Sequence, residues 1–172
     1  EIPNVETQPE DCLNPYSVSK VSGEKLCKMY SDLFGLETVV FRYFNVYGEN
    51  QPTKGQYAPV IGLFLKQLKE DKPLTIVPDG NQRRDFTHVS DVVSANILAS
   101  TVSLKEYGQV FNVGTGTNHS VNEIAKMISD KTVMIEPRIG ESRETLANVN
   151  KTKTSLGWRP KIKLDEWIAS QL

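Results

Sequence analysis

The sequence predicts an α/β fold, because segments typical of buried strands alternate with segments typical of helices. Two apolar runs, 38–44 and 109–113, are rich in β-branched and aromatic residues and alternate little, which is the pattern of strands buried on both faces of a parallel sheet. Helical signals lie before the first run, at 15–34, and after the second, at 120–130. The length of 172 residues fits one domain or part of one.

Composition narrows the classes of partner. The formal net charge of −1 offers no basic surface for a nucleic acid or an anionic membrane. No apolar run approaches the length of a membrane span, and no signal peptide is visible. Cys12 and Cys27 are isolated, and no His or Cys has the spacing of metal ligands, so we expect reduced thiols, no metal site and a cytoplasmic protein.

The first helix is expected over 15–34. Asn14 is a good N-cap, Pro15 suits the first helical position, and Gly35 provides a stop. The apolar residues that recur at helical spacing and predict a buried stripe are Leu26, Met29, Tyr30 and Leu33.

Tyr16 and Lys20 stand four residues apart near the start of this helix, so the phenol and the ammonium group project from the same face. A neighbouring cation favours the ionised form of a phenol, which makes such a tyrosine usable as an acid or base. A buried tyrosine and a solvated lysine one turn apart would give the same pattern, and a Tyr-x-x-x-Lys motif alone is too short to decide.

The strand 38–44 is followed by Asn45, so a polar amide stands at its carboxyl end, where ligands of α/β sheets bind. An amide that only caps the strand would give the same pattern. The elements expected next are a loop over 49–57, a helix from Pro59, a strand over 74–77, a turn over 78–81 and a helix capped by Ser90 that runs to about residue 103.

After the strand 109–113, Ser120 and Glu123 form a capping box for a helix up to Asp130. The elements expected beyond it are a strand over 132–136, a short helix capped by Asn150 and ended by Gly157, and a last helix over 164–172.

The stretch Gly114-Thr115-Gly116 follows a strand and precedes a helix, as a dinucleotide-binding turn would. However, His119 occupies the position of the third glycine, and the helix begins too late for its N-terminus to face a pyrophosphate. We therefore expect these glycines to serve a tight crossing from strand to helix.

Several stretches together carry a resemblance to a known family. They are PYSVSK at 15–20, FRYFNVYG at 41–48 and DGNQRRDFTHV at 79–89, supported by FNVGTG at 111–116, PRIGE at 137–141 and LGWRP at 156–160. In this order they resemble the extended short-chain dehydrogenase/reductase family, specifically its NAD-dependent nucleotide-sugar epimerases and dehydratases and above all the UDP-glucose 4-epimerases.

The resemblance covers nearly the whole chain, 1–172, and implies the C-terminal half of such an enzyme. The implied parts are the catalytic helix 15–34, two strands of a partial NAD-binding Rossmann-type sheet near 38–45 and 109–113, and a C-terminal substrate-binding domain made of 49–104 and 114–172. The Gly-rich turn that holds the NAD pyrophosphate and the catalytic Ser or Thr are not in the sequence. The chain alone is therefore expected to bind NAD weakly and to turn over no sugar, and the edges of its two sheet strands are expected to be unpaired.

The resemblance also assigns roles. Tyr16 removes a proton from a sugar hydroxyl while NAD takes the hydride from the same carbon, and Lys20 binds the nicotinamide ribose. Phe44 meets the nicotinamide through its backbone, and Asn45 contacts the substrate near its diphosphate. Arg84 and Arg138 bind the nucleotide phosphates and ribose, to which a guanidinium is well suited. Of the remaining substrate-binding positions, Glu141 stands where the family has a ribose-binding Asp, and the residues of the base pocket are Val60, Thr75 and Val77.

The function expected for the parent protein is NAD-dependent epimerisation of a nucleotide sugar, most of all a UDP-sugar, through a transient keto intermediate. The family implies a homodimer through the first helix. Arg83, next to Arg84 in a turn, is expected to be solvated, and His88 to pack or bond locally. Two alternatives stay open: a nucleotide-sugar 4,6-dehydratase or reductase of the same family, and a truncated, non-catalytic chain that self-associates.

Overall fold

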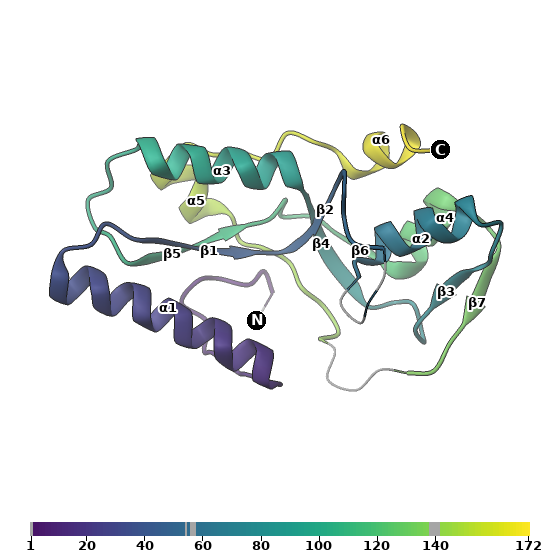
Figure 1. Ribbon diagram of the computed structural model, residues 1–172, viewed down its shortest axis with the longest axis horizontal. Helices are drawn as coiled ribbons and strands as arrows, with labels where there is room; N and C mark the ends of the chain where they lie inside the picture. The colour runs from purple at the N-terminus through teal and green to yellow at the C-terminus, as the bar shows by residue number, and fades with distance from the viewer. Residues whose placement is uncertain (1, 54, 56–57, 138–141) are drawn as a thin grey trace.

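The computed structural model describes residues 2–53, 55, 58–137 and 142–172 and confirms the α/β architecture. Its elements form two parts that lie next to each other (Figure 1). In the first, the parallel strands β1 (Val39–Tyr43) and β5 (Gln109–Val113) carry α1 (Pro15–Phe34) on one face, and α3 (Val89–Thr101) and α5 (Asn150–Leu156) on the other (Figure 1). The buried residues of this part are Val92, Ala95, Phe111, Val113, Ala147, Val149, Leu156 and Trp158.

The second part begins where the chain leaves β1. β2 (Asn45–Tyr47) pairs in parallel with β4 (Arg83–His88), which pairs antiparallel with β6 (Asn118–Ser120). A separate parallel pair joins β3 (Leu74–Ile76) to β7 (Thr132–Met134). Asn45 stands just past the carboxyl end of β1, as the sequence predicted, and the chain continues from it into β2, a strand of another sheet.

Three helices close the core of the second part: α2 (Val60–Lys69), α4 (Val121–Ile128) and α6 (Leu164–Ala169). Its buried residues are Tyr47, Ile61, Phe64, Leu74, Ile76, Phe86, Val121, Ile124, Ala125, Ile128, Leu164, Trp167 and Ile168. The separate clusters of buried apolar side chains show that each part has its own core.

Several helix ends follow the capping signals of the sequence, and two depart from them. Asn14 caps α1 in a capping box and Gly35 ends it in a left-handed conformation, while Ser120 and Glu123 form the expected box at α4. Two expected caps are wrong. His88 caps α3 in place of Ser90, whose backbone N–H donates to His88 Nδ1 at 3.1 Å, and the residue at the start of α5 is Val149, with Asn150 inside the helix.

His88 has the local, structural role that the sequence predicted. Its side chain is buried, with its ring against the edge of Tyr47 and near Trp167. Trp167 in turn donates from its indole N–H to Glu49 Oε1 at 2.9 Å, which lowers the pKa of the Glu49 carboxyl. These contacts fasten α6 to the end of β2.

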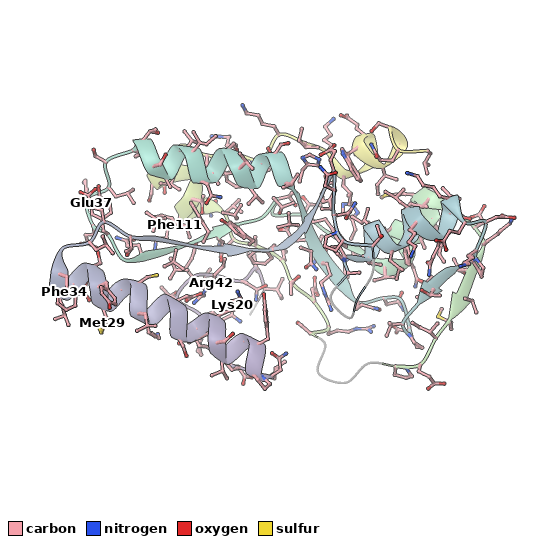
Figure 2. The ribbon with its side chains drawn as sticks, in the orientation of Figure 1. Lys20, Met29, Phe34, Glu37, Arg42 and Phe111 are labelled. Atoms are coloured by element: carbon pink, nitrogen blue, oxygen red, sulfur yellow. The ribbon has the colours of Figure 1, made fainter. Side chains whose placement is uncertain are left out.

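The apolar stripe of α1 is exposed, so the prediction that it is buried is wrong for the described chain. Leu26, Met29, Tyr30 and Leu33 are between 37% and 69% exposed. Figure 2 shows Met29 on the side of α1 that faces away from the sheet. The periodicity predicted an apolar face correctly, but nothing in the described chain covers that face.

Polar contacts attach α1 to the sheet instead. Arg42, on β1, lies between α1 and the strand (Figure 2) and donates to both carboxylate oxygens of Glu24, at 2.8 and 2.6 Å. This pair raises the pKa of Arg42. The Thr38 hydroxyl donates to the Cys27 carbonyl at 3.0 Å. The inner face of α1 thus makes polar contacts with the sheet, while its apolar stripe is exposed.

The two sheet strands were both expected to have unpaired edges, which is wrong for β5. Its outward backbone groups are occupied by side chains: Lys151 Nζ donates to the Val110 carbonyl at 2.7 Å, and Thr152 Oγ1 donates to the Asn112 carbonyl at 2.6 Å. The Asn112 N–H donates to Glu6 Oε1 at 2.9 Å. β1 is the other edge of this two-stranded sheet, so a further strand could pair only there.

Candidate functional site

One cavity of about 560 Å³ opens between the two parts of the chain and brings together seven of the residues that the sequence singled out. They are Tyr16, Phe44, Asn45, Val60, Thr75, Val77 and Arg84. The seven are contributed by α1, by the junction of β1 and β2, by α2, by β3 and the residue that follows it, and by β4. They are spread over about 70 residues of sequence, so the fold rather than chain proximity assembles this group.

Tyr16 and Lys20 lie on the same face of α1, as the spacing of four predicts. The Lys20 ammonium nitrogen is 5.2 Å from the centroid of the Tyr16 ring, within the range of a cation–π contact. Tyr16 lines the cavity and its side chain is 60% exposed, so a ligand in the cavity can reach the phenol. The arrangement can hold a proton-transfer group beside a fixed positive charge.

Phe44 and Asn45 form the junction between the two parts. The Phe44 N–H still donates to the Val113 carbonyl of β5, at 3.0 Å, whereas Asn45 is already in register with Phe86 of β4. The bend places both residues at the cavity, where the carboxyl end of β1 meets the start of β2. This is the sheet edge at which α/β proteins bind ligands.

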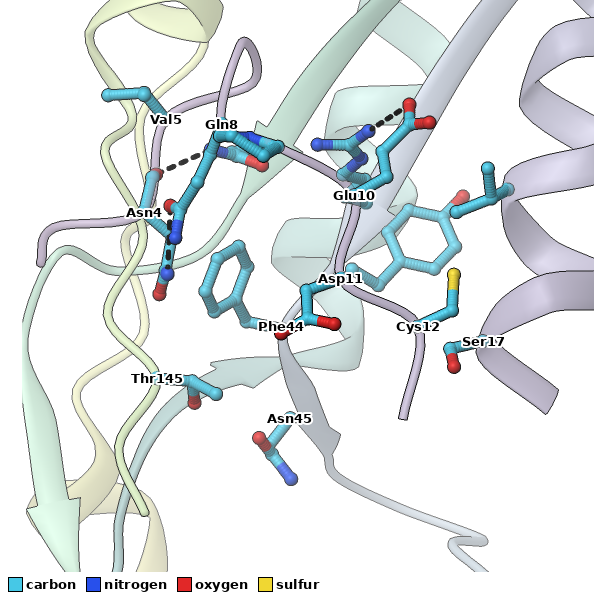
Figure 3. A pocket seen from close by; sticks show the side chains of 15 residues that line it. Asn4, Val5, Gln8, Glu10, Asp11, Cys12, Ser17, Phe44, Asn45 and Thr145 are labelled. Carbon is cyan, nitrogen blue, oxygen red and sulfur yellow. Dashed lines mark hydrogen bonds and ion pairs between the residues drawn. The ribbon is translucent and has the colours of Figure 1, made fainter. Parts of the chain in front are cut away.

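A second hollow, of about 480 Å³, also has Phe44 and Asn45 in its wall (Figure 3). Its other side is the N-terminal segment, from which Asn4, Glu10 and Asp11 project. Asn4 anchors that segment, because its backbone N–H donates to the Leu146 carbonyl at 2.7 Å. The junction is therefore accessible from two sides.

Arg84 and Arg83 are neighbours on β4 with different surroundings. Arg84 lines the cavity, and its guanidinium donates to the Arg83 carbonyl at 2.9 Å. Arg83 points to β6 and α4, where it donates to Asn118 Oδ1 at 2.8 Å and forms an ion pair with Glu123 at 3.1 Å. The expectation that Arg83 is solvated is wrong, because strand alternation turns it onto the other face, where an acceptor carboxylate lies.

Sequence reasoning missed Gln82, which also lines the cavity. A signal was available, since Gln82 precedes Arg84 by two residues and an extended chain places such residues on the same face. The turn before it is held by Arg143, whose guanidinium donates to both carboxylate oxygens of Asp79 at 2.7 and 3.1 Å and keeps the pKa of that carboxyl well below its ordinary value. The sequence-predicted residues Arg138 and Glu141 lie outside the described residues.

The Gly114–Gly116 loop does not offer its backbone amides to a ligand. The buried Asp85 carboxylate accepts hydrogen bonds from the Thr115 and Gly116 N–H groups, at 2.7 and 2.9 Å. This supports the expectation that the loop is a structural crossing. Within the described ranges, no group of His, Cys, Asp and Glu side chains is placed to hold a metal ion, and none of the described helices is long and apolar enough to cross a membrane.

Comparison with known proteins supports the family resemblance that the sequence motifs carry. Residues 1–114 match the profile of the NAD dependent epimerase/dehydratase family. A candidate UDP-glucose 4-epimerase of Methanocaldococcus jannaschii is 41% identical over 174 residues, covering 97% of this chain and 55% of the relative. The UDP-glucose 4-epimerase of Mycolicibacterium smegmatis is 34% identical over 173 residues, covering 97% of this chain and 54% of the relative.

Solved structures agree in fold as well as in sequence. UDP-glucose 4-epimerase of Thermotoga maritima, solved with UDP-glucose, is 35% identical with a TM-score of 0.83. The match covers 90% of this chain and 50% of the Thermotoga chain. UDP-glucuronic acid 4-epimerase of Bacillus cereus, solved with UDP-glucuronic acid and NAD, is 32% identical with a TM-score of 0.90. The match covers 99% of this chain and 55% of the Bacillus chain.

The chain thus spans about half the length of the relatives that it matches. The profile match covers well over half of the 172 residues and includes Tyr16, Lys20, Phe44, Asn45 and Arg84. The chain belongs to the NAD-dependent epimerase/dehydratase family, whose cofactor is NAD.

Proposed function

We propose that this chain supplies the acid/base residue and the nucleotide-sugar site of an NAD-dependent 4-epimerase that acts on a UDP-sugar. The observation that carries the proposal is the single cavity that joins Tyr16 to Asn45 and Arg84. The relatives named above support it, because their names and ligands are those of UDP-sugar epimerases. The proposal that this segment is the C-terminal half of the enzyme rests on the motif resemblance alone and stays a prediction.

The residues have distinct tasks in this proposal. NAD, when bound, would supply the hydride chemistry at the sugar carbon. Tyr16 takes the proton of the hydroxyl on that carbon, and the Lys20 ammonium stabilises the phenolate and binds the nicotinamide ribose. Asn45, at the junction of the two parts, holds the substrate close to its diphosphate. The guanidinium of Arg84 neutralises phosphate charge.

The described residues fit one end of NAD and not the other. Tyr16 and Lys20 are exposed on one helix face beside Phe44, where a ribose and a nicotinamide ring can be held. The Gly114–Gly116 loop does not fit the pyrophosphate, since the Thr115 and Gly116 amides are already bonded to Asp85. We therefore propose that the rest of the enzyme binds the pyrophosphate.

Replacing Arg84 by Ala should weaken UDP-glucose binding by about tenfold or more, the scale expected for losing a hydrogen bond between charged groups. Isothermal titration calorimetry of the chain with UDP-glucose measures this affinity, and Arg159→Ala is the control. Arg159 is exposed and lies outside the cavity. In the complete enzyme the affinity for NAD should change less than the affinity for UDP-glucose. Equal UDP-glucose affinity of wild type and Arg84→Ala would contradict the assignment.

We also propose a homodimer through the apolar face of α1, because an exposed apolar stripe of this length marks an interaction surface. Leu33 is 69% exposed on that face. Leu33→Glu should therefore convert the dimer to a monomer, as measured by light scattering. Ile97→Glu is the matched control, since Ile97 is 59% exposed on α3 and lies outside the stripe. A wild-type chain that is monomeric at high concentration would exclude this interface.

A further inference from the structure

Gln82 has an unsatisfied acceptor beside the cavity. Its side chain is only 9% exposed, and it lines the cavity wall. Its Nε2 donates to the Val77 carbonyl at 3.3 Å, slightly longer than the usual range, while Oε1 is buried with no hydrogen-bond partner among the described residues. A buried acceptor without a partner is unfavourable, so a donor that enters the cavity would be drawn to this amide.

The position of Gln82, directly before β4, indicates which part of a nucleotide it would meet. Asn45 is level with Phe86 in the strand register. Arg84 lies two residues before that level, about 7 Å along an extended strand, and Gln82 lies four residues before it, about 13 Å. If Asn45 contacts the sugar end of the diphosphate and Arg84 the phosphates, the base reaches Gln82.

The surroundings of Gln82 suit a flat heterocycle. Apolar side chains that line the cavity include Pro59, Val60, Leu63, Val77, Val121 and Ile135. Thr75 adds a hydroxyl to this wall, and its Oγ1 accepts a hydrogen bond from Gln67 Nε2 at 2.9 Å. Because that oxygen already accepts, its own proton is left to donate into the cavity. The wall therefore offers a donor from Thr75 and an acceptor from Gln82.

We propose that Gln82 is a specificity-determining residue that reads the base of the nucleotide, its carboxamide oxygen accepting a hydrogen bond from a ring N–H of a pyrimidine such as N3–H of uracil. This inference rests on the proposed function, because it assumes that the cavity holds the nucleotide. The long Nε2 contact to Val77 lets the amide turn so that Oε1 meets the ring N–H. Thr75 then donates to the neighbouring carbonyl of the base.

The test compares the binding of UDP and of N3-methyl-UDP, which lacks the ring N–H, by NMR titration of the chain. Wild type should bind N3-methyl-UDP about five- to tenfold more weakly than UDP, the scale for one neutral hydrogen bond. Gln82→Met, which keeps the length but replaces the amide oxygen by a weakly accepting thioether, should bind UDP more weakly by a similar factor. It should also bind the two ligands within about twofold of each other.

Gln51→Met is the matched control, because Gln51 Oε1 is also buried without a partner in the described structure but lies outside this cavity. It should discriminate between the two ligands as wild type does. Equal affinity of wild type for UDP and N3-methyl-UDP would overturn the inference, and this comparison needs no variant to fold. UDP binding by Gln82→Met as tight as wild type would also overturn it while leaving the proposed function in place. Failure of wild type to bind UDP at millimolar concentration would overturn the proposed nucleotide site itself.

Discussion

Replacing Tyr16 by Phe in a complete enzyme that contains this segment should lower turnover by roughly a hundredfold or more, the usual scale for losing a general acid or base. The substitution removes one hydroxyl and keeps the ring. The ring lies 5.2 Å from the Lys20 ammonium and belongs to the cavity wall, so the contacts that position the helix are retained. The loss should therefore appear in kcat, with the affinity for the nucleotide sugar nearly unchanged.

The measurement is the interconversion of UDP-glucose and its 4-epimer, followed with saturating NAD. Tyr30→Phe serves as the matched control. Tyr30 is 47% exposed on the same helix, but it is outside the cavity, so the loss of its hydroxyl should leave turnover unchanged. If Tyr16→Phe turned over at a rate close to that of wild type, Tyr16 would have no part in proton transfer.

The sequence predicted which residues lie together better than it predicted the surfaces around them. Tyr16, Lys20, Asn45 and Arg84 were identified by motifs whose members are local, and the fold brings three of them into one cavity. The helix ends were predictable for the same reason, since a cap such as Asn14 acts on backbone groups within one turn.

Features that depend on residues distant in the sequence could not be predicted from local patterns. The helical spacing of Leu33 and its neighbours predicts an apolar face, but periodicity does not say whether anything covers that face. The partners of Arg83 on β6 and α4 lie 35 and 40 residues away, so a turn-like context suggested solvation. The outward backbone groups of β5 are hydrogen-bonded by Glu6, Lys151 and Thr152, three side chains that no local pattern links to the strand.

Asp85 explains how the two parts of the chain are held in their relative positions. Its Oδ1 accepts from the Thr115 N–H and hydroxyl, both at 2.7 Å, and its Oδ2 accepts from the N–H groups of Gly116 and Ala147, at 2.9 and 3.1 Å. The carboxylate thus joins β4 of the second part to the loop after β5 of the first. Gly114 packs so closely that an added Cβ would lie 2.4 Å from the Ala147 Cβ, which leaves no room for a bulkier residue.

Asp85→Asn should accordingly lower the free energy of unfolding by about 3 kcal/mol or more, because a buried network of hydrogen bonds to a charged acceptor is broken. The amide keeps one acceptor oxygen and turns an NH₂ group toward N–H donors, so at least one backbone amide loses its partner. Urea unfolding measures the change, and Asp32→Asn is the control. Asp32 forms only an exposed ion pair with Lys28, at 2.9 Å, whose loss should cost less than about 1 kcal/mol. Equal unfolding free energies for Asp85→Asn and Asp32→Asn would show that the two parts are held together by apolar packing rather than by this carboxylate.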